Sequence, residues 1–149
     1  QNLPVLDRST LAPASSVRQG GYILWESSST PDVIIISTGS EVHIAMDAAQ
    51  QLSEGGTAVR VVSLPSWELF DGQSQEYKDS VLPPNITARV SIEAGSQMGW
   101  ERYVGLKGRI IGLSHFGASA PIATLYEKFG LTAERVVEEA KAALQQVKV

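Results

Sequence analysis

The sequence contains no cysteine, and several kinds of chemistry are excluded with it. Disulfide bonds, thiolate catalysis and cysteine-ligated zinc all need this residue, and its absence fits a reducing compartment. Histidine occurs only at His43 and His115, which do not have the spacing of a zinc site. We therefore expect no metal site in this chain.

Long apolar runs and basic clusters are missing as well. No stretch reaches the roughly 18 consecutive apolar residues that a membrane-spanning helix needs. The 12 Lys and Arg residues are scattered and outnumbered by 16 Asp and Glu, which gives a net charge of −4. A surface that neutralises nucleic-acid phosphates needs a basic stripe instead. We expect no membrane or nucleic-acid partner, and a cytoplasmic protein unless an upstream transit peptide directs it to a plastid.

The composition predicts one folded domain with a short entry segment. The chain has 149 residues, of which 43% are hydrophobic, and this length suits a single core. Residues 1–20 are polar, contain proline and lack a sustained apolar period, so we interpret them as a linker. Residues 21–149 form the predicted domain.

The apolar patterns predict a three-layer α/β fold. The β-branched run at 33–37 is typical of a central strand covered on both faces. The run at 22–26 and the Ser-rich turn after it predict a hairpin with 33–37, and hence one antiparallel edge strand. Further strands and helices alternate, which predicts a mostly parallel sheet of about five strands with helices on both faces. The further strands are predicted at 59–63, 88–92 and 109–113, and the helices from Ser40 to Gly55, at 66–70, 74–81 and 121–129, and after Thr132.

Four residues are candidates for a ligand loop at the carboxyl end of this sheet. Gly39 and Ser40 join a strand to a helix, while Glu93 and His115 each follow a later strand. Open α/β sheets commonly bind ligands at this edge. Each residue also has a plain structural role as a turn, a helix cap, a hydrogen-bonded carboxylate or a loop residue, and we favour those roles. No nucleophile or second carboxylate accompanies them in the sequence, so no catalytic residue is predicted.

Two aromatic residues are candidates for an interface. Trp67 and Phe70 fall in one short predicted helix between Pro65 and Asp71. Large aromatic side chains either cover a sheet or anchor a partner subunit. Core packing is the default, and this pair is the first choice for an interface patch.

An ordered set of motifs resembles the C-terminal domain of transketolase. The set covers essentially the whole chain, and Gln1 to Pro4 resembles the linker that enters this domain. The motifs are TGSEV at 38–42, RVVSLPSWELFD at 60–71, YKDSVLP at 77–83, TARVSIEAG at 87–95, Trp100 with YVG at 103–105, and FGASAP at 116–121.

The resemblance implies a homodimeric parent enzyme that transfers a two-carbon ketol unit between sugar phosphates, in the pentose phosphate pathway and the Calvin cycle. Thiamine diphosphate and Mg²⁺ or Ca²⁺ serve that reaction, and the family's first two domains hold them together with most substrate contacts. The third domain adds packing and dimer surface. The resemblance therefore implies no catalytic, cofactor or metal residue in this chain, which is expected to be inactive alone.

Other interpretations stay open on the sequence. One is a stand-alone binding or regulatory module that uses Gly39, Ser40, Glu93 and His115 as its pocket. Another is a purely structural dimerisation domain. Dihydroxyacetone synthase shares this domain, and the motifs favour transketolase over it.

Overall fold

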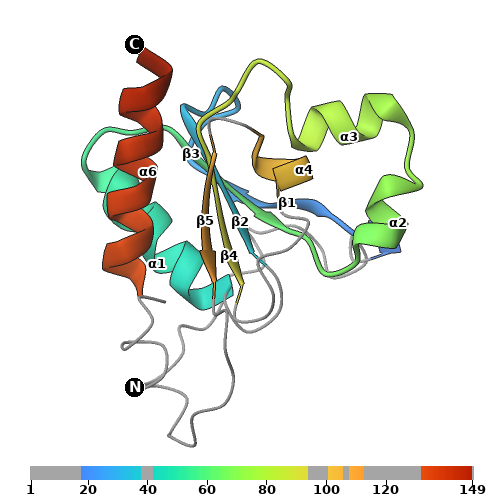
Figure 1. Cartoon of the computed structure of the whole chain (residues 1–149), viewed down its shortest axis with the longest axis horizontal. Coiled ribbons are helices and arrows are strands. Elements are labelled where there is room, and N and C mark those ends of the chain that lie inside the picture. The colour runs from blue at the N-terminus through green and yellow to red at the C-terminus, as the bar shows by residue number, and fades with distance from the viewer. Residues whose placement is uncertain (1–17, 38–41, 94–100, 106–107, 113–131, 149) are drawn as a thin grey trace, which may run out of the picture.

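The structure is a computed structural model that describes residues 18–37, 42–93, 101–105, 108–112 and 132–148. Its centre is a five-stranded sheet with strand order β1-β3-β2-β4-β5 (Figure 1). Strands β3, β2, β4 and β5 are parallel, and β1 runs antiparallel to β3 at the edge. The strands are β1 (Tyr22–Glu26), β2 (Val33–Ser37), β3 (Val59–Ser63), β4 (Arg89–Glu93) and β5 (Arg109–Gly112).

Strand β2 is the central strand, as its β-branched sequence predicts. All five of its residues are buried, and it pairs in parallel with β3 on one edge and β4 on the other. Branched side chains suit a strand that is covered on both faces. The predicted antiparallel edge strand is also confirmed, in β1.

The predicted hairpin between β1 and β2 is wrong, because β3 lies between them. The connecting segment crosses the start of β3, where the Ser27 amide donates to the Val59 carbonyl at 2.9 Å and the Asp32 amide to the Ala58 carbonyl at 2.8 Å. A buried central strand needs neighbours on both edges, and the helical crossover supplies β3 as one of them. The remaining edge of β3 is then the one that β1 can join.

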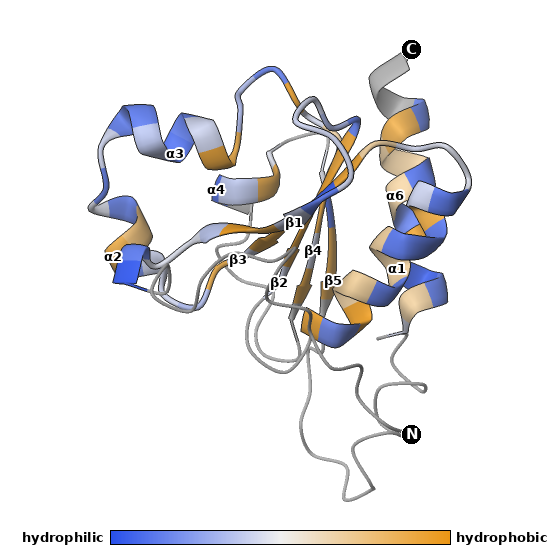
Figure 2. Cartoon of the chain, turned by 180° about the vertical axis from the view of Figure 1, so that it is seen from behind, coloured by the Kyte–Doolittle hydropathy of each residue, from blue (hydrophilic) through white to orange (hydrophobic). Residues whose placement is uncertain are grey.

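Two long helices cover one face of the sheet. They are α1 (Val42–Glu54) and α6 (Ala133–Lys148), which lie side by side in Figure 1 and, seen from behind, in Figure 2. Helix α1 ends before Gly56, whose φ of 95° suits glycine. The Thr132 hydroxyl accepts the Arg135 amide at 3.2 Å, which confirms Thr132 as the predicted cap of α6.

Three short helices cover the other face. They are α2 (Trp67–Asp71), α3 (Gln75–Val81) and α4 (Glu101–Val104). The Ser66 and Ser74 hydroxyls cap α2 and α3 by accepting the amides of Leu69 and Tyr77. Sequence patterns predict α2 and α3 but not the single turn of α4. The helix predicted at 121–129 and the cap predicted at Ser40 lie outside the described residues.

An arginine of β3 connects α3, on this second face, to the edge strand β1. The side chain of Arg60 is buried and donates to Glu26 at 2.8 Å. It also donates to the carbonyls of Ser80 and Val81 at 3.0 and 3.1 Å. A buried guanidinium is tolerated only when its donors are satisfied in this way. Arg60 therefore links β1, β3 and the end of α3.

Candidate functional site

The predicted ligand loop maps to the carboxyl edge of the sheet. Strands β2 and β4 are neighbours, with Ser37 opposite Ile92, and Glu93 at the end of β4 lies opposite Gly112 of β5. The last residues of β2, β4 and β5 therefore lie at the same edge of the sheet. Gly39, Ser40 and His115 lie outside the described residues, so their joint role with Glu93 stays a prediction.

No metal-binding cluster occurs among the residues whose structure is described. Nowhere in the described ranges do three or more His, Asp or Glu side chains come together in a way that could hold an ion. His43 is half-buried on α1. The described residues thus do not fit a divalent metal and its diphosphate ligand. In the same part of the chain, no helix is long and apolar enough to span a membrane.

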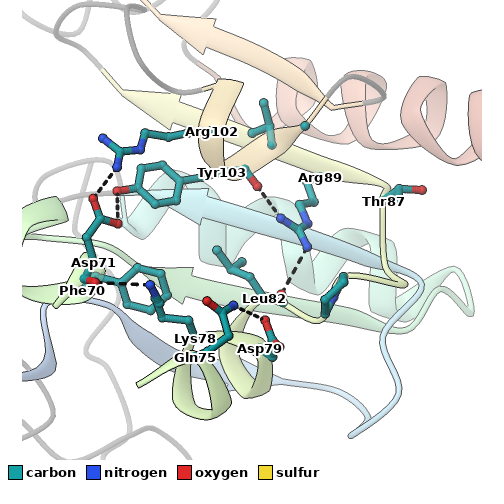
Figure 3. Close-up of a pocket in the computed structure, with 13 residues that line it drawn as sticks. Phe70, Asp71, Gln75, Lys78, Asp79, Leu82, Thr87, Arg89, Arg102 and Tyr103 are labelled. Carbon is teal, nitrogen blue, oxygen red and sulfur yellow. Dashed lines mark hydrogen bonds and ion pairs between the residues drawn. The ribbon is translucent and has the colours of Figure 1, made fainter. Parts of the chain in front are cut away.

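A cavity opens on the second face, toward the amino ends of β4 and β5. Its volume is about 620 Å³. Its walls come from α3, α4, the end of α2 and the segment that leads into β4, as Figure 3 shows. The residues that line it are Phe70, Asp71, Gln75, Lys78, Asp79, Leu82, Pro84, Thr87, Arg89, Arg102, Tyr103, Val104 and Gly105.

Asp71 organises the rim of this cavity. Its carboxylate accepts from Arg102 at 2.6 Å and from the Tyr103 hydroxyl at 3.0 Å (Figure 3). Its backbone carbonyl accepts from the Lys78 ammonium at 3.2 Å. Burial raises the pKa of the Tyr103 hydroxyl, and the hydrogen bond to Asp71 and its negative charge raise the pKa further, against the opposing charge of Arg102. Asp71 thereby connects α2 to both α3 and α4.

Arg89 forms the inner wall. Its guanidinium donates to the carbonyls of Ile86 at 2.9 Å, Pro83 at 2.8 Å and Leu82 at 3.3 Å, and also to the carbonyl of Tyr103. No carboxylate within the described ranges forms an ion pair with it. Burial lowers the pKa of Arg89, because desolvation disfavours the charged form. Among the described residues, the guanidinium is therefore held by carbonyl dipoles.

The candidate interface residues are placed differently from each other. Phe70 is 2% exposed and belongs to the core of the second face, so its side chain offers almost no surface to a partner. Trp67 is half-buried, with its ring edge-on to Tyr103 at 5.0 Å between centroids. Its neighbour Leu69 is 50% exposed. The apolar surface of α2 is thus carried by Trp67 and Leu69, and its role at an interface stays a prediction.

Sequence reasoning missed the cavity. Its charged residues come from segments far apart in the chain, and each looks like an ordinary surface residue on its own helix. Arg89 gives the one available signal, because a charged residue at the start of a buried strand needs a partner on the covering layer.

Comparison with known proteins identifies the family. The family model described as "Transketolase-like TK C-terminal domain" matches residues 20–132, most of the chain. The chain is a member of the transketolase C-terminal domain family. It is 54% identical over 143 residues, or 95% of its length, to the chloroplastic transketolase of Craterostigma plantagineum. It is 57% identical over 85% of its length to the chloroplastic transketolase of Spinacia oleracea.

Solved transketolase structures share the fold. A transketolase from Pichia stipitis in complex with xylulose 5-phosphate superposes with a TM-score of 0.85 at 38% identity, over 99% of this chain and 21% of that one. A transketolase from Leishmania mexicana gives 0.81 at 42% identity, over 89% of this chain and 19% of that one. The chain spans 27% and 17% of the length of the two plant transketolases. It thus corresponds to a small part of these longer proteins.

Proposed function

We propose that this chain works as the C-terminal domain of a transketolase, where it supports the assembled enzyme and carries no catalytic group. The parent enzyme transfers a two-carbon ketol unit from a ketose phosphate to an aldose phosphate. Thiamine diphosphate and a divalent metal, Mg²⁺ or Ca²⁺, serve that reaction in domains outside this chain. The match of nearly the whole chain to about a fifth to a quarter of longer transketolases is the observation that carries this proposal.

The domain's contribution is structural. The remaining transketolase domains and a second subunit of a homodimer are its proposed partners, and the parent acts on sugar phosphates. The position of the first residues of the domain supports packing of a neighbouring domain near α2. The Gly20 carbonyl accepts the Ser66 amide at 3.0 Å, so the start of the domain lies beside α2, where Leu69 is 50% exposed. An apolar side chain exposed beside the connection to a neighbouring domain suits packing between them.

One relative supports the expectation that such a part is inactive alone. The chain covers 43% of a protein described as "Split gene transketolase, inactive beta4 tetramer", with a TM-score of 0.67 at 25% identity. That description places this fold in a chain that lacks activity when it assembles by itself. The match to transketolases over nearly the whole chain also leaves the stand-alone module unsupported.

The compartment follows the parent protein. Several of the similar plant transketolases are described as chloroplastic, so a plastid is the proposed location if the parent carries a transit peptide. Without one, the cytoplasm is the proposed location.

The test is a calorimetric titration of the 149-residue chain with thiamine diphosphate and Mg²⁺. We expect no saturable heat at sub-millimolar ligand, because the cofactor groups belong to other domains. Circular dichroism of the same sample checks that the chain is folded. A stoichiometric isotherm would show that this chain holds a cofactor site and would overturn the proposal.

A further inference from the structure

The cavity on the second face has the size of a ligand site. Small-molecule pockets commonly enclose about 300–1,000 Å³, and this cavity of about 620 Å³ lies within that range. It is bordered by Thr87 and Arg89, at the amino end of β4. Glu93, the one residue of the predicted ligand loop that the structure describes, is at the opposite, carboxyl end of β4.

Two cations face this cavity without a carboxylate partner. Lys78 donates to the carbonyl of Asp71, and Arg89 donates only to carbonyls. Neither forms an ion pair with any residue in the described ranges. A carbonyl dipole compensates only part of a full positive charge, so an anion in the cavity would gain from both groups.

The carboxylates of the wall do not cancel this charge. Asp71 is already engaged by Arg102 and Tyr103, which leaves little negative potential for other groups. Asp79 accepts a hydrogen bond from the Gln75 amide at 2.8 Å and is the second carboxylate of the lining. With three cations and two carboxylates, the wall keeps one net positive charge.

The remaining wall offers apolar surface and hydroxyl contacts. Leu82 and Val104 are buried and form an apolar base, while the half-buried Thr87 adds a hydroxyl group. Ligand sites generally combine such an apolar lining with a few convergent polar groups. Figure 3 shows that Lys78 and Arg89 reach the cavity from different elements, α3 and the start of β4.

We propose that this cavity binds a small organic phosphate, with Lys78 and Arg89 contacting the phosphate group. A phosphate monoester carries about −1.5 to −2 charges near neutral pH, which matches two cations that lack carboxylate partners. Arg89 has one N–H left on Nη1 after its carbonyl contacts, and the Lys78 ammonium has two. The organic part lies against Leu82. The proposal concerns a site in this chain and is independent of any activity of the parent enzyme.

The test is a titration of the 149-residue chain with ribose 5-phosphate, followed by calorimetry and by amide chemical shifts. We expect saturable binding at about millimolar concentration, with the largest shifts in α3 and at the start of β4. Free ribose should give no saturable signal, and inorganic phosphate should compete. Higher salt should weaken the binding, because the cavity is open to solvent. A folded chain without saturable ribose 5-phosphate binding overturns the proposal.

Substitutions with opposite effects on charge give the second readout. Lys78→Gln removes one cation and should weaken binding about tenfold, as expected for losing one charge-assisted contact. Asp79→Asn removes the nearby carboxylate and should tighten it by a few-fold. Lys141→Gln, on the exposed side of α6, is the matched control and should bind like the original chain. Arg89 is left unchanged because its carbonyl contacts support the fold. If Lys78→Gln and Lys141→Gln bind equally well while both fold, the assignment is wrong.

Discussion

The two faces of the sheet are built in different ways. On the face covered by α1 and α6, the core is mostly aliphatic, and many of the helix residues buried in it are alanines. On the face covered by α2, α3 and α4, the core also contains the buried aromatic rings of Phe70 and Tyr103, and Arg60 and Arg89 tie the short helices to the strands. The alanines of the first face that are wholly buried are Ala45, Ala48, Ala49, Ala140 and Ala143.

The comparison shows two ways in which helices can be held against the face of a parallel sheet. Small side chains let two long helices lie close to the strands, so the first face is held by apolar burial. The second face has helices too short to bury much area each, and it relies on directional contacts of Arg60, Asp71 and Arg89. Such contacts fix positions without filling space, and the large cavity lies on this side.

The sharpest test of this difference uses two neighbours on β2. Ile35 belongs to the core of the first face and Ile36 to that of the second, and both are fully buried. Replacing a buried isoleucine by alanine costs about 2–5 kcal/mol, depending on how far the surroundings collapse. We expect Ile35→Ala to cost about 4 kcal/mol and Ile36→Ala about 3 kcal/mol, measured by urea unfolding.

The smaller loss is expected at Ile36 because the second face is covered by short helices, which can shift more easily into the space left by the deleted atoms than the two long helices can. If either alanine variant fails to fold, Ile35→Val and Ile36→Val are compared in its place. Each should lower the free energy of unfolding by about 1 kcal/mol, with the larger loss at Ile35. Equal losses at the two positions, or a larger loss at Ile36, would mean that the second face is packed as tightly as the first.

An intermediate effect is expected at Tyr103, which joins α4 to Asp71. Tyr103→Phe removes the hydroxyl and should cost about 1 kcal/mol at neutral pH. Burial raises the pKa of Tyr103 above its ordinary value of 10.0 in the folded chain. Because the folded chain favours the protonated hydroxyl, the stability linked to the raised pKa is fully present below about pH 10 and decreases as the pH rises above that value.

Urea unfolding at about pH 8 and about pH 10.5 measures this loss. The original chain should lose more stability between the two values than Tyr103→Phe does. Some slope should remain in the variant, because burial also raises the pKa of Tyr77. An identical slope in both chains would show that Tyr103 ionises as freely in the folded chain as in the unfolded one.

The smallest effect is expected at two serines inside the sheet. The hydroxyls of Ser37 and Ser91 are buried and have no hydrogen-bond partner among the residues that the structure describes. By strand alternation, Ser37 points to the same face as Ile35, and Ser91 points to the face opposite Val90 and Ile92. Since an unpaired buried hydroxyl costs stability, Ser37→Ala and Ser91→Ala should each leave the stability unchanged or raise it by about 1 kcal/mol.

Thermal unfolding of both variants checks this prediction. A gain at Ser91 alone would show that the polar cost is concentrated on the second face. A clear loss at either position would show that the hydroxyl has a partner in the folded chain.

Much of the fold could be predicted because its signals are local. The β-branched run of β2, the serine caps of α2 and α3, the Thr132 cap and the helix-ending Gly56 all act within a few residues of chain. The partner of β1 could not be predicted this way. It depends on which edge remains open after β2 has taken both of its neighbours.

For the candidate site too, some features could be predicted from the sequence and others could not. The order of motifs was enough to indicate the transketolase C-terminal domain, because a family pattern is itself a property of sequence. The cavity and its two cations without carboxylate partners were decided by the tertiary structure alone. Lys78 and Arg89 meet there only after α3 has packed over the amino end of β4, since neither the desolvation nor the carbonyl contacts of Arg89 exist in the separate segments.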